Sequence, residues 1–229
     1  MQNPHGAHPQ LDGGPDIVLV GIAHHDGVFG AGFDRAQGQL EHILFRSPAR
    51  DPEELANTLV NRLRVDFDQA LEACTNLWNA QLEEAYVLPG ARELIESLKS
   101  AGIPRAYLSN IWPPFYEHFK QEFPDEAAHQ PQFLSFQTGL LKPDPGFFQL
   151  ALRAVEARAE DAVMVGDTYR NDIRPAIELG MRTVWVLHRP EKEKADLIAV
   201  LNGSAPPPDL TLSSIADLKP SKLLTHANH

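Results

Sequence analysis

Short apolar runs that alternate with amphipathic segments constrain the fold of this chain more than any other feature. The runs at 17–23, 162–165 and 183–187 are continuous and rich in β-branched residues. Such runs are typical of strands that are buried on both faces of a parallel sheet. Shorter runs at 106–108, 133–136 and 210–212 predict further strands, the last of them at an edge of the sheet. Repeated strand–helix units predict a Rossmann-like α/β fold, in which a mostly parallel sheet is the middle of three layers.

The segment from 51 to 85 interrupts this alternation because its pattern is entirely helical. Asp51 and Pro52 form a helix-start signal, and leucines recur at fourfold spacing at 55, 59 and 63. We therefore predict an α/β core at 16–34 and 87–219 and a small all-helical cap at 35–86. Residues 1–15, rich in Gly, Pro, His and Asn, are expected to form a disordered tail, and 220–229 a second tail.

The composition limits the classes of partner. Among 229 residues, 20 are basic and 31 acidic, which gives a formal net charge of −11 with His neutral. Such a surface repels nucleic acid and anionic membranes, so neither is an expected partner, and the longest apolar run is too short to span a bilayer. The single Cys74 cannot form an internal disulfide. Cytoplasm is therefore the expected compartment.

Polar residues that follow the predicted strands are the candidates for a functional site. Ligands bind at the carboxyl ends of the strands in an open parallel sheet, where three carboxylates, a lysine and a hydroxyl would converge. Oxygen-rich clusters of this kind suit Mg²⁺ together with a substrate phosphate, and the lysine and the hydroxyl can bind phosphate oxygens. The candidates are His24, Asp26, Ser109, Asn110, Lys142, Asp167 and Asp172.

Each segment also has a plainer interpretation. The pair Ser109-Asn110 by itself is typical of an ordinary strand-end turn. Lys142-Pro143-Asp144-Pro145 reads equally well as a turn and a helix start, and the segment from Asp167 to Asp172 as a loop with an N-cap. Their occurrence in this order, each after its strand, favours one shared site.

The order and spacing of these residues resemble the haloacid dehalogenase-like (HAD) superfamily from about 17 to 187. Ser109 matches its second motif, Lys142 its third, and Asp167 with Asp172 its fourth, while 87–90 is similar to the usual return from the helical cap. The resemblance implies a hydrolase acting on a small phosphorylated molecule. It assigns the phosphoryl group to Ser109, Asn110 and Lys142. It assigns Mg²⁺ to Asp26, Asp167 and Asp172.

The first motif departs from the pattern of the superfamily, which reads Asp-x-Asp-Gly. This chain has His24, His25, Asp26 and Gly27, so Asp26 matches the acid/base position and His24 stands in the place of the attacking aspartate. An aspartyl-phosphate intermediate cannot form, and loss of a covalent nucleophile costs on the order of 10⁶ in turnover in other enzymes. Mg²⁺ also loses one hard oxygen ligand to an imidazole, which prefers softer transition metals. We therefore expect weak or no Mg²⁺-dependent phosphatase activity.

Three hypotheses remain open at this point, besides the plainer interpretation of His24 as a core histidine. The first is a non-catalytic relative that keeps a phosphate-binding cleft. In the second, an active enzyme uses His24 as the phosphoryl acceptor, or as a ligand of Mn²⁺, Zn²⁺ or Fe²⁺ with Asp167 and Asp172, and Asp26 donates the proton. The third is an interaction protein that binds a partner through its cap or its acidic surface. The sequence makes no prediction of the oligomeric state.

Overall fold

A parallel sheet forms the centre of the protein. The computed structural model describes residues 17–21, 40 and 43–223. The strands follow the order β3-β2-β1-β4-β5-β6, and every pair of neighbours is parallel. Their bounds are Ile17–Val20 (β1), Arg105–Ser109 (β2), Gln132–Leu134 (β3), Ala162–Gly166 (β4), Arg182–Val186 (β5) and Leu210–Leu212 (β6). The predicted α/β fold class is confirmed.

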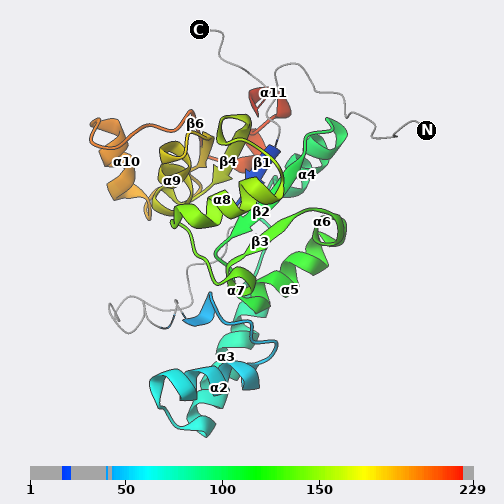
Figure 1. Ribbon diagram of the computed structural model, residues 1–229, viewed down its shortest axis with the longest axis vertical. Coiled ribbons are helices and arrows are strands. Elements are labelled where there is room, and N and C mark those ends of the chain that lie inside the picture. Colours follow the sequence, from blue (N-terminus) through cyan, green and yellow to red (C-terminus); the bar gives the residue numbers. More distant parts are fainter. Residues whose placement is uncertain (1–16, 22–39, 41–42, 224–229) are drawn as a thin grey trace, which may run out of the picture.

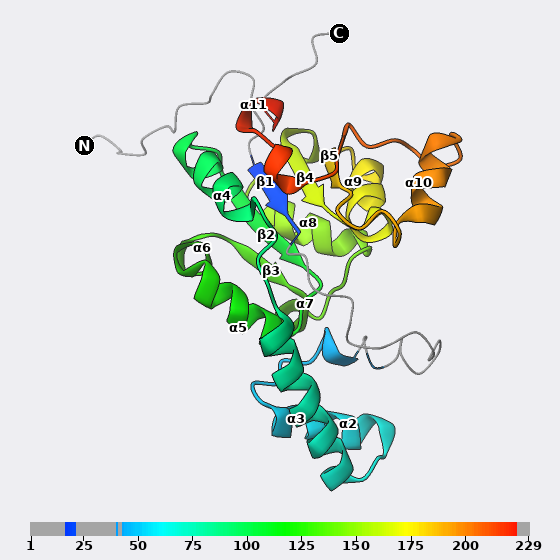
Figure 2. The same cartoon turned by 180° about the vertical axis from the view of Figure 1, so that it is seen from behind.

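Helices cover both faces of the sheet. α8 (Pro145–Ala154) and α9 (Arg174–Glu178) lie on the face turned toward the viewer in Figure 1. α4 (Ala91–Ser100) and α5 (Pro113–Glu122) lie on the opposite face, which Figure 2 brings to the front. These helices and the sheet are the three predicted layers.

β1 and β4 carry no polar side chain because their residues alternate between two cores. Leu19 and Met164 pack toward α8 with Phe148. Their neighbours Val18 and Val163 pack on the other side of the sheet with Leu98 of α4. Burial on both faces removes the need for polar residues in these strands.

A helical cap extends beyond the carboxyl ends of the strands (Figure 1). It contains α2 (Pro52–Leu63) and α3 (Phe67–Glu84), which begin at the N-cap residues Asp51 and Asp66. The Asp51 side chain accepts a hydrogen bond from the Glu54 amide at 2.8 Å, which satisfies one of the free donors at the helix start.

An apolar cluster joins the described part of the cap to the core. Cys74 and Trp78 of α3 are buried there with Ile111 and Trp112, which follow β2. The rings of Trp78 and Trp112 meet edge to face, with centroids 5.6 Å apart. This contact fixes the direction in which α3 leaves the core.

The remaining elements are short. They are α6 (Pro124–His129), α7 (Ser135–Thr138), η1 (Ala159–Asp161), the π-helical turn η2 (Tyr169–Ile173), α10 (Lys194–Leu201), η3 (Ile215–Asp217) and α11 (Pro220–Leu223). α11 follows the predicted core boundary at 219, and its Leu223 is buried in the core.

One expectation about local structure differs from the structure. The predicted strand at 133–136 ends at Leu134, and α7 begins at Ser135 because the Ser135 hydroxyl exchanges hydrogen bonds with the backbone of Ile111. α4 begins at Ala91, after Gly90 with φ 90°. An added Cβ at Gly90 would lie 2.5 Å from the Ala216 Cβ, so this close approach requires glycine.

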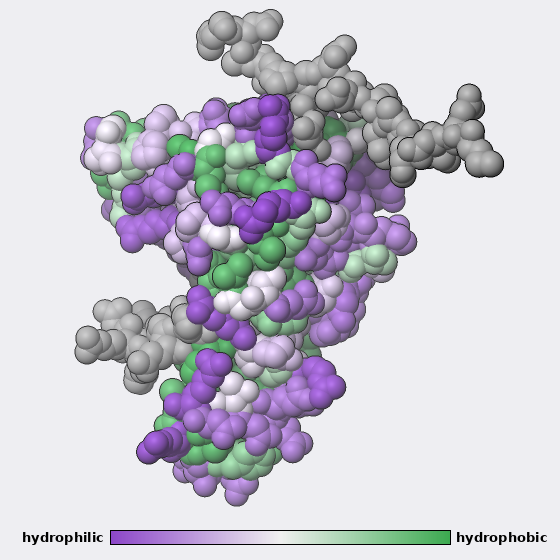
Figure 3. All heavy atoms as spheres, viewed as in Figure 1, coloured by the Kyte–Doolittle hydropathy of each residue, from purple (hydrophilic) through white to green (hydrophobic). Residues whose placement is uncertain are grey.

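Exposed apolar side chains lie mainly at two ends of the molecule. Ile198 and Leu201 are exposed on α10, and Leu63 and Val65 at the turn between α2 and α3. Figure 3 shows both regions as apolar surface mixed with hydrophilic side chains. Within the described residues, no helix combines the length and the apolar character that a bilayer span requires.

Candidate functional site

The predicted site residues that the structure describes lie at the carboxyl ends of the central strands. Ser109 is the last residue of β2 and is fully buried, and Asp167 follows β4 directly. Lys142 and Asp172 are also buried, with 7% and 2% of their surface exposed. His24 and Asp26 lie outside the described residues. Gly21 is the described residue nearest to them before the gap, and its amide donates to the Val165 carbonyl at 2.8 Å.

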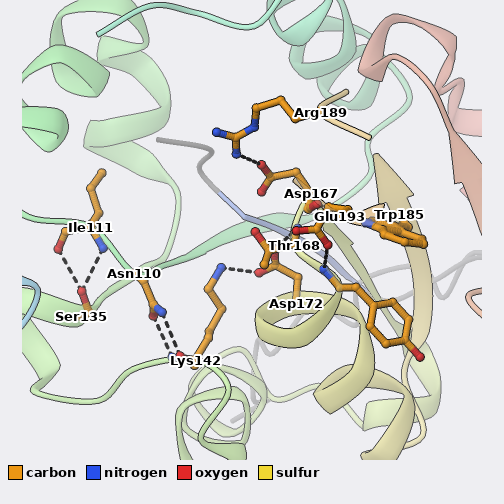
Figure 4. A network of polar contacts seen from close by, with 11 residues as sticks. Asn110, Ile111, Ser135, Lys142, Asp167, Thr168, Asp172, Trp185, Arg189 and Glu193 are labelled. Carbon is orange, nitrogen blue, oxygen red and sulfur yellow. Dashed lines mark hydrogen bonds and ion pairs between the residues drawn. The ribbon is translucent and has the colours of Figure 1, made fainter. Parts of the chain in front are cut away.

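An ion pair between Lys142 and Asp172 forms the centre of the site (Figure 4). Asp172 reaches Lys142 with Oδ1, and its Oδ2 accepts a hydrogen bond from the Thr168 amide at 3.0 Å. Both side chains are buried, so each charge is compensated by its partner and not by water. Lys142 of the third motif and Asp172 of the fourth therefore meet at the edge of the sheet, as the sequence predicted.

Asn110 holds the backbone of Lys142 in place. Its amide nitrogen donates to the Lys142 carbonyl at 2.9 Å, and its amide oxygen accepts from the Lys142 amide at 2.7 Å (Figure 4). This pair of bonds ties the segment after β2 to the loop that carries the lysine. The structure thus gives Asn110 a positioning role, and its expected contact with phosphate stays a prediction.

Asp167 contacts a cation that the sequence patterns did not single out. Its Oδ2 accepts a hydrogen bond from Arg189 at 2.7 Å, and His188 Nδ1 lies 3.9 Å from the same oxygen. The Trp185 indole donates to the Asp167 carbonyl at 3.1 Å, which fixes the backbone at this point. Arg189 follows β5, the neighbour of β4, so the rule that located Ser109 and Asp167 also applies to Arg189.

Glu193 is a further carboxylate near the site that sequence reasoning missed. It accepts a hydrogen bond from the Tyr169 amide at 2.8 Å, beside the segment that carries Asp167 and Asp172 (Figure 4). Burial raises the pKa of Glu193, and the negative charges of Asp196, Asp167 and Asp172 raise it further. Its segment precedes α10 and carries no strand-end signal, so no simple pattern would have identified it.

The arrangement is chemically suited to an anion with several oxygens. Lys142 and Arg189 provide two cations, each already paired with a carboxylate, and Ser109 adds a buried hydroxyl. An ammonium and a guanidinium both bind phosphate oxygens through charge-assisted hydrogen bonds. Asp167 and Asp172 add carboxylate oxygens, the ligands that hard divalent cations prefer.

Sequence relatives of this chain include phosphatases. The chain is 28% identical over 157 residues to a glyceraldehyde 3-phosphate phosphatase from Pyrococcus furiosus, a match that covers 67% of this chain and 64% of that protein. A glyceraldehyde 3-phosphate phosphatase from Pyrococcus abyssi is 33% identical over 157 residues, with 67% and 65% covered. A ribulose-1,5-bisphosphate 5-phosphatase from Halopiger xanaduensis is 33% identical over 107 residues, with 47% and 45% covered. The chain therefore spans less than two thirds of the length of these relatives.

Solved structures share the fold. CbbY from Rhodobacter sphaeroides in complex with phosphate superposes with a TM-score of 0.55 at 19% identity, covering 89% of this chain and 96% of that one. L-2-haloacid dehalogenase from Xanthobacter autotrophicus gives a TM-score of 0.54 at 18% identity, covering 90% and 97%. The sequence model of the haloacid dehalogenase-like hydrolases matches residues 17–180, a range that holds β1 to β4 and the candidates Ser109, Asn110, Lys142, Asp167 and Asp172. This chain belongs to the haloacid dehalogenase-like hydrolase family.

Proposed function

We propose that this protein binds a small phosphomonoester and has weak or no Mg²⁺-dependent phosphatase activity. The observation that carries the proposal is the buried Lys142–Asp172 pair with Asp167 beside it, in a chain whose sequence has His24 at the nucleophile position. The cationic side chains needed to bind a phosphoryl group are retained. The carboxylate that would attack phosphorus is not.

The sequence relatives support phosphate esters as the ligand class. Those named above act, by their names, on glyceraldehyde 3-phosphate and on ribulose 1,5-bisphosphate. Lys142 would bind a phosphoryl oxygen as a point charge, and Ser109 would donate a hydrogen bond to another. These roles need no nucleophile, so binding can persist where turnover is lost.

A divalent cation would be held by Asp167 and Asp172, whose hard oxygens suit Mg²⁺. When bound, such an ion neutralises phosphate charge. Arg189 already occupies Asp167 Oδ2, and the described residues contain no cluster of three acidic, His or Cys side chains able to hold a metal. His24 in place of a carboxylate would weaken a Mg²⁺ site further and would suit Mn²⁺, Zn²⁺ or Fe²⁺ better. We therefore expect Mg²⁺ to bind more weakly, and turnover to be lower, than in a site where an aspartate stands in the place of His24.

The test is a comparison of the wild type with His24→Asp and with the neighbouring control His25→Asp. Each is assayed with Mg²⁺ against a panel that includes p-nitrophenyl phosphate, glyceraldehyde 3-phosphate and ribulose 1,5-bisphosphate. We expect turnover to appear in His24→Asp only, because a carboxylate then stands at the attacking position in an otherwise retained site.

A second measurement separates the alternatives. Phosphate binding by isothermal titration calorimetry should be present in the wild type and weakened at least tenfold in Lys142→Met, since the mutation removes the phosphate-binding charge. Wild-type turnover with Mn²⁺, Zn²⁺ or Fe²⁺ that disappears in His24→Ala would instead establish an active enzyme that uses the imidazole. Absence of phosphate binding in the wild type would refute the proposal.

A further inference from the structure

An apolar pocket of about 110 Å³ lies on the side of the sheet that α4 and α5 cover. Its walls come from the end of β1, from both helices and from the segment that returns from the cap. Val20, Leu88, Ile95, Phe115 and Phe119 are among the side chains that line it. Ala85 and Tyr86, which follow α3, also line it, so the pocket lies where the chain returns from the cap to the core.

The pocket adjoins the candidate site. Gly21 lines it, and a Cβ added to Gly21 would lie 3.5 Å from Lys142 Nζ and 3.5 Å from Asp172 Oδ1. Arg189, which donates to Asp167, lines the pocket on another side. Gly21 and Arg189 therefore belong both to the wall of the pocket and to the surroundings of the Lys142–Asp172 and Asp167 contacts.

Two histidines belong to the lining. His118 of α5 and His188 after β5 both line the pocket. His118 Nε2 and His188 Nδ1 are buried, and neither has a hydrogen-bond partner among the residues that the structure describes. These two nitrogen atoms are closed off from the pocket, so they add no hydrogen-bonding position to its largely apolar surface.

We propose that this pocket takes the alcohol part of the phosphomonoester, and that this part is one aromatic ring or a branched alkyl group of similar size. The proposal rests on the proposed phosphate-binding function and adds the substrate class. A dry apolar cavity of ~150 Å³ binds benzene in another protein, so about 110 Å³ has room for one ring and little more. The hydroxyl groups of a sugar chain would lie against Val20, Ile95 and Phe119 and would have no hydrogen-bond partners there.

The experiment compares three non-hydrolysable probes by isothermal titration calorimetry of the full chain: inorganic phosphate, phenylphosphonate and 2-hydroxyethylphosphonate. Burial of one ring in an apolar site corresponds to roughly tenfold to hundredfold in affinity. We expect phenylphosphonate to bind at least tenfold more tightly than 2-hydroxyethylphosphonate. Equal affinity of the two phosphonates, with inorganic phosphate still bound, overturns the pocket proposal alone. Loss of all three overturns the proposed function itself.

A pair of variants tests the location. Ala91→Phe places a ring in the pocket from the start of α4, and Ala154→Phe makes the same change at an exposed position on α8. We expect only Ala91→Phe to abolish the preference for phenylphosphonate, with inorganic phosphate binding and the thermal midpoint retained. If Ala91→Phe lowers the thermal midpoint by 5 °C or more relative to Ala154→Phe, the space is already filled by the protein and the proposal is wrong. A preference that survives Ala91→Phe also contradicts it.

Discussion

Gly166 is the position at which a single added carbon should disturb this site most. It ends β4, and a Cβ placed there would lie 2.5 Å from Asp172 Cγ and 2.6 Å from Asp172 Oδ2. Favourable contacts between carbon atoms are ~3.5–4.0 Å, so Asp172 would have to move by about 1 Å or more. Asp172 is 2% exposed and is held by Lys142 and by the Thr168 amide, so any such movement strains both bonds.

The expected cost of Gly166→Ala follows from these contacts. Overpacking a buried site costs ~1–3 kcal/mol, and a buried ion pair that loses one partner outright costs ~3–5 kcal/mol. Because Ala would distort the Lys142–Asp172 pair without removing it, we expect a loss of ~2–4 kcal/mol in the free energy of unfolding, by combining these two ranges. At ~2–4 °C per kcal/mol for a domain of this size, the melting temperature should fall by about 5–15 °C.

Urea denaturation and phosphate titration measure both consequences of Gly166→Ala. Gly21→Ala is the matched control, because its added Cβ would meet Lys142 Nζ and Asp172 Oδ1 at 3.5 Å, an ordinary contact distance. We expect Gly166→Ala to lose stability and to bind inorganic phosphate at least tenfold more weakly, and Gly21→Ala to remain within ~1 kcal/mol of the wild type. Equal stability of the two variants would show that the packing of Gly166 against Asp172 does not hold the site.

Three further predictions concern other parts of the molecule. Burial raises the pKa of Glu126, but the hydrogen bonds from Arg105 and Tyr107 outweigh it and the pKa is lowered. Glu126→Ala should therefore lower the free energy of unfolding, measured by urea denaturation at pH 7, by ~3–5 kcal/mol. The difference in unfolding free energy between wild type and variant should shrink as the pH falls through the folded-state pKa of Glu126. A difference that does not change with pH would argue against the ion pair. Because the pKa of Glu193 is raised, its contribution to stability is present at low pH and is lost as the pH rises. The melting temperature of Glu193→Gln should therefore rise relative to that of the wild type between pH 4 and pH 8. A difference in melting temperature that stays constant over this range would contradict the prediction. Burial raises the pKa of Cys74 to about 11, so a thiol reagent at pH 8 should modify it only after denaturation, and rapid modification of the native protein would show that the cap–core cluster is open.

Local patterns sufficed for most of the fold. The apolar runs predicted the strands because burial on both faces favours apolar residues at successive positions, as Val18 and Leu19 illustrate by packing on opposite sides of the sheet. The cap helices were predictable because Asp51 gives a local start signal. α6 and α10 were missed. α10 has none of its residues fully buried and shows no one-sided apolar pattern, and α6 is a short turn after Pro124.

For the candidate site, the sequence predicted which residues lie at the edge of the sheet but not their contacts. The sequence by itself determined the strand-end positions of Ser109 and Asp167 and the presence of imidazole at residue 24, because order along a parallel sheet decides which residues meet at its edge. It could not predict which charges pair.

The pairing of Arg189 with Asp167, the use of Asn110 to hold Lys142, and the apolar pocket beside Gly21 were decided by the tertiary structure alone. Each joins segments that lie more than 20 residues apart or arises between separate helices. The physical reason is that ion pairs and cavities depend on the distances between packed elements, and no local periodicity records those distances.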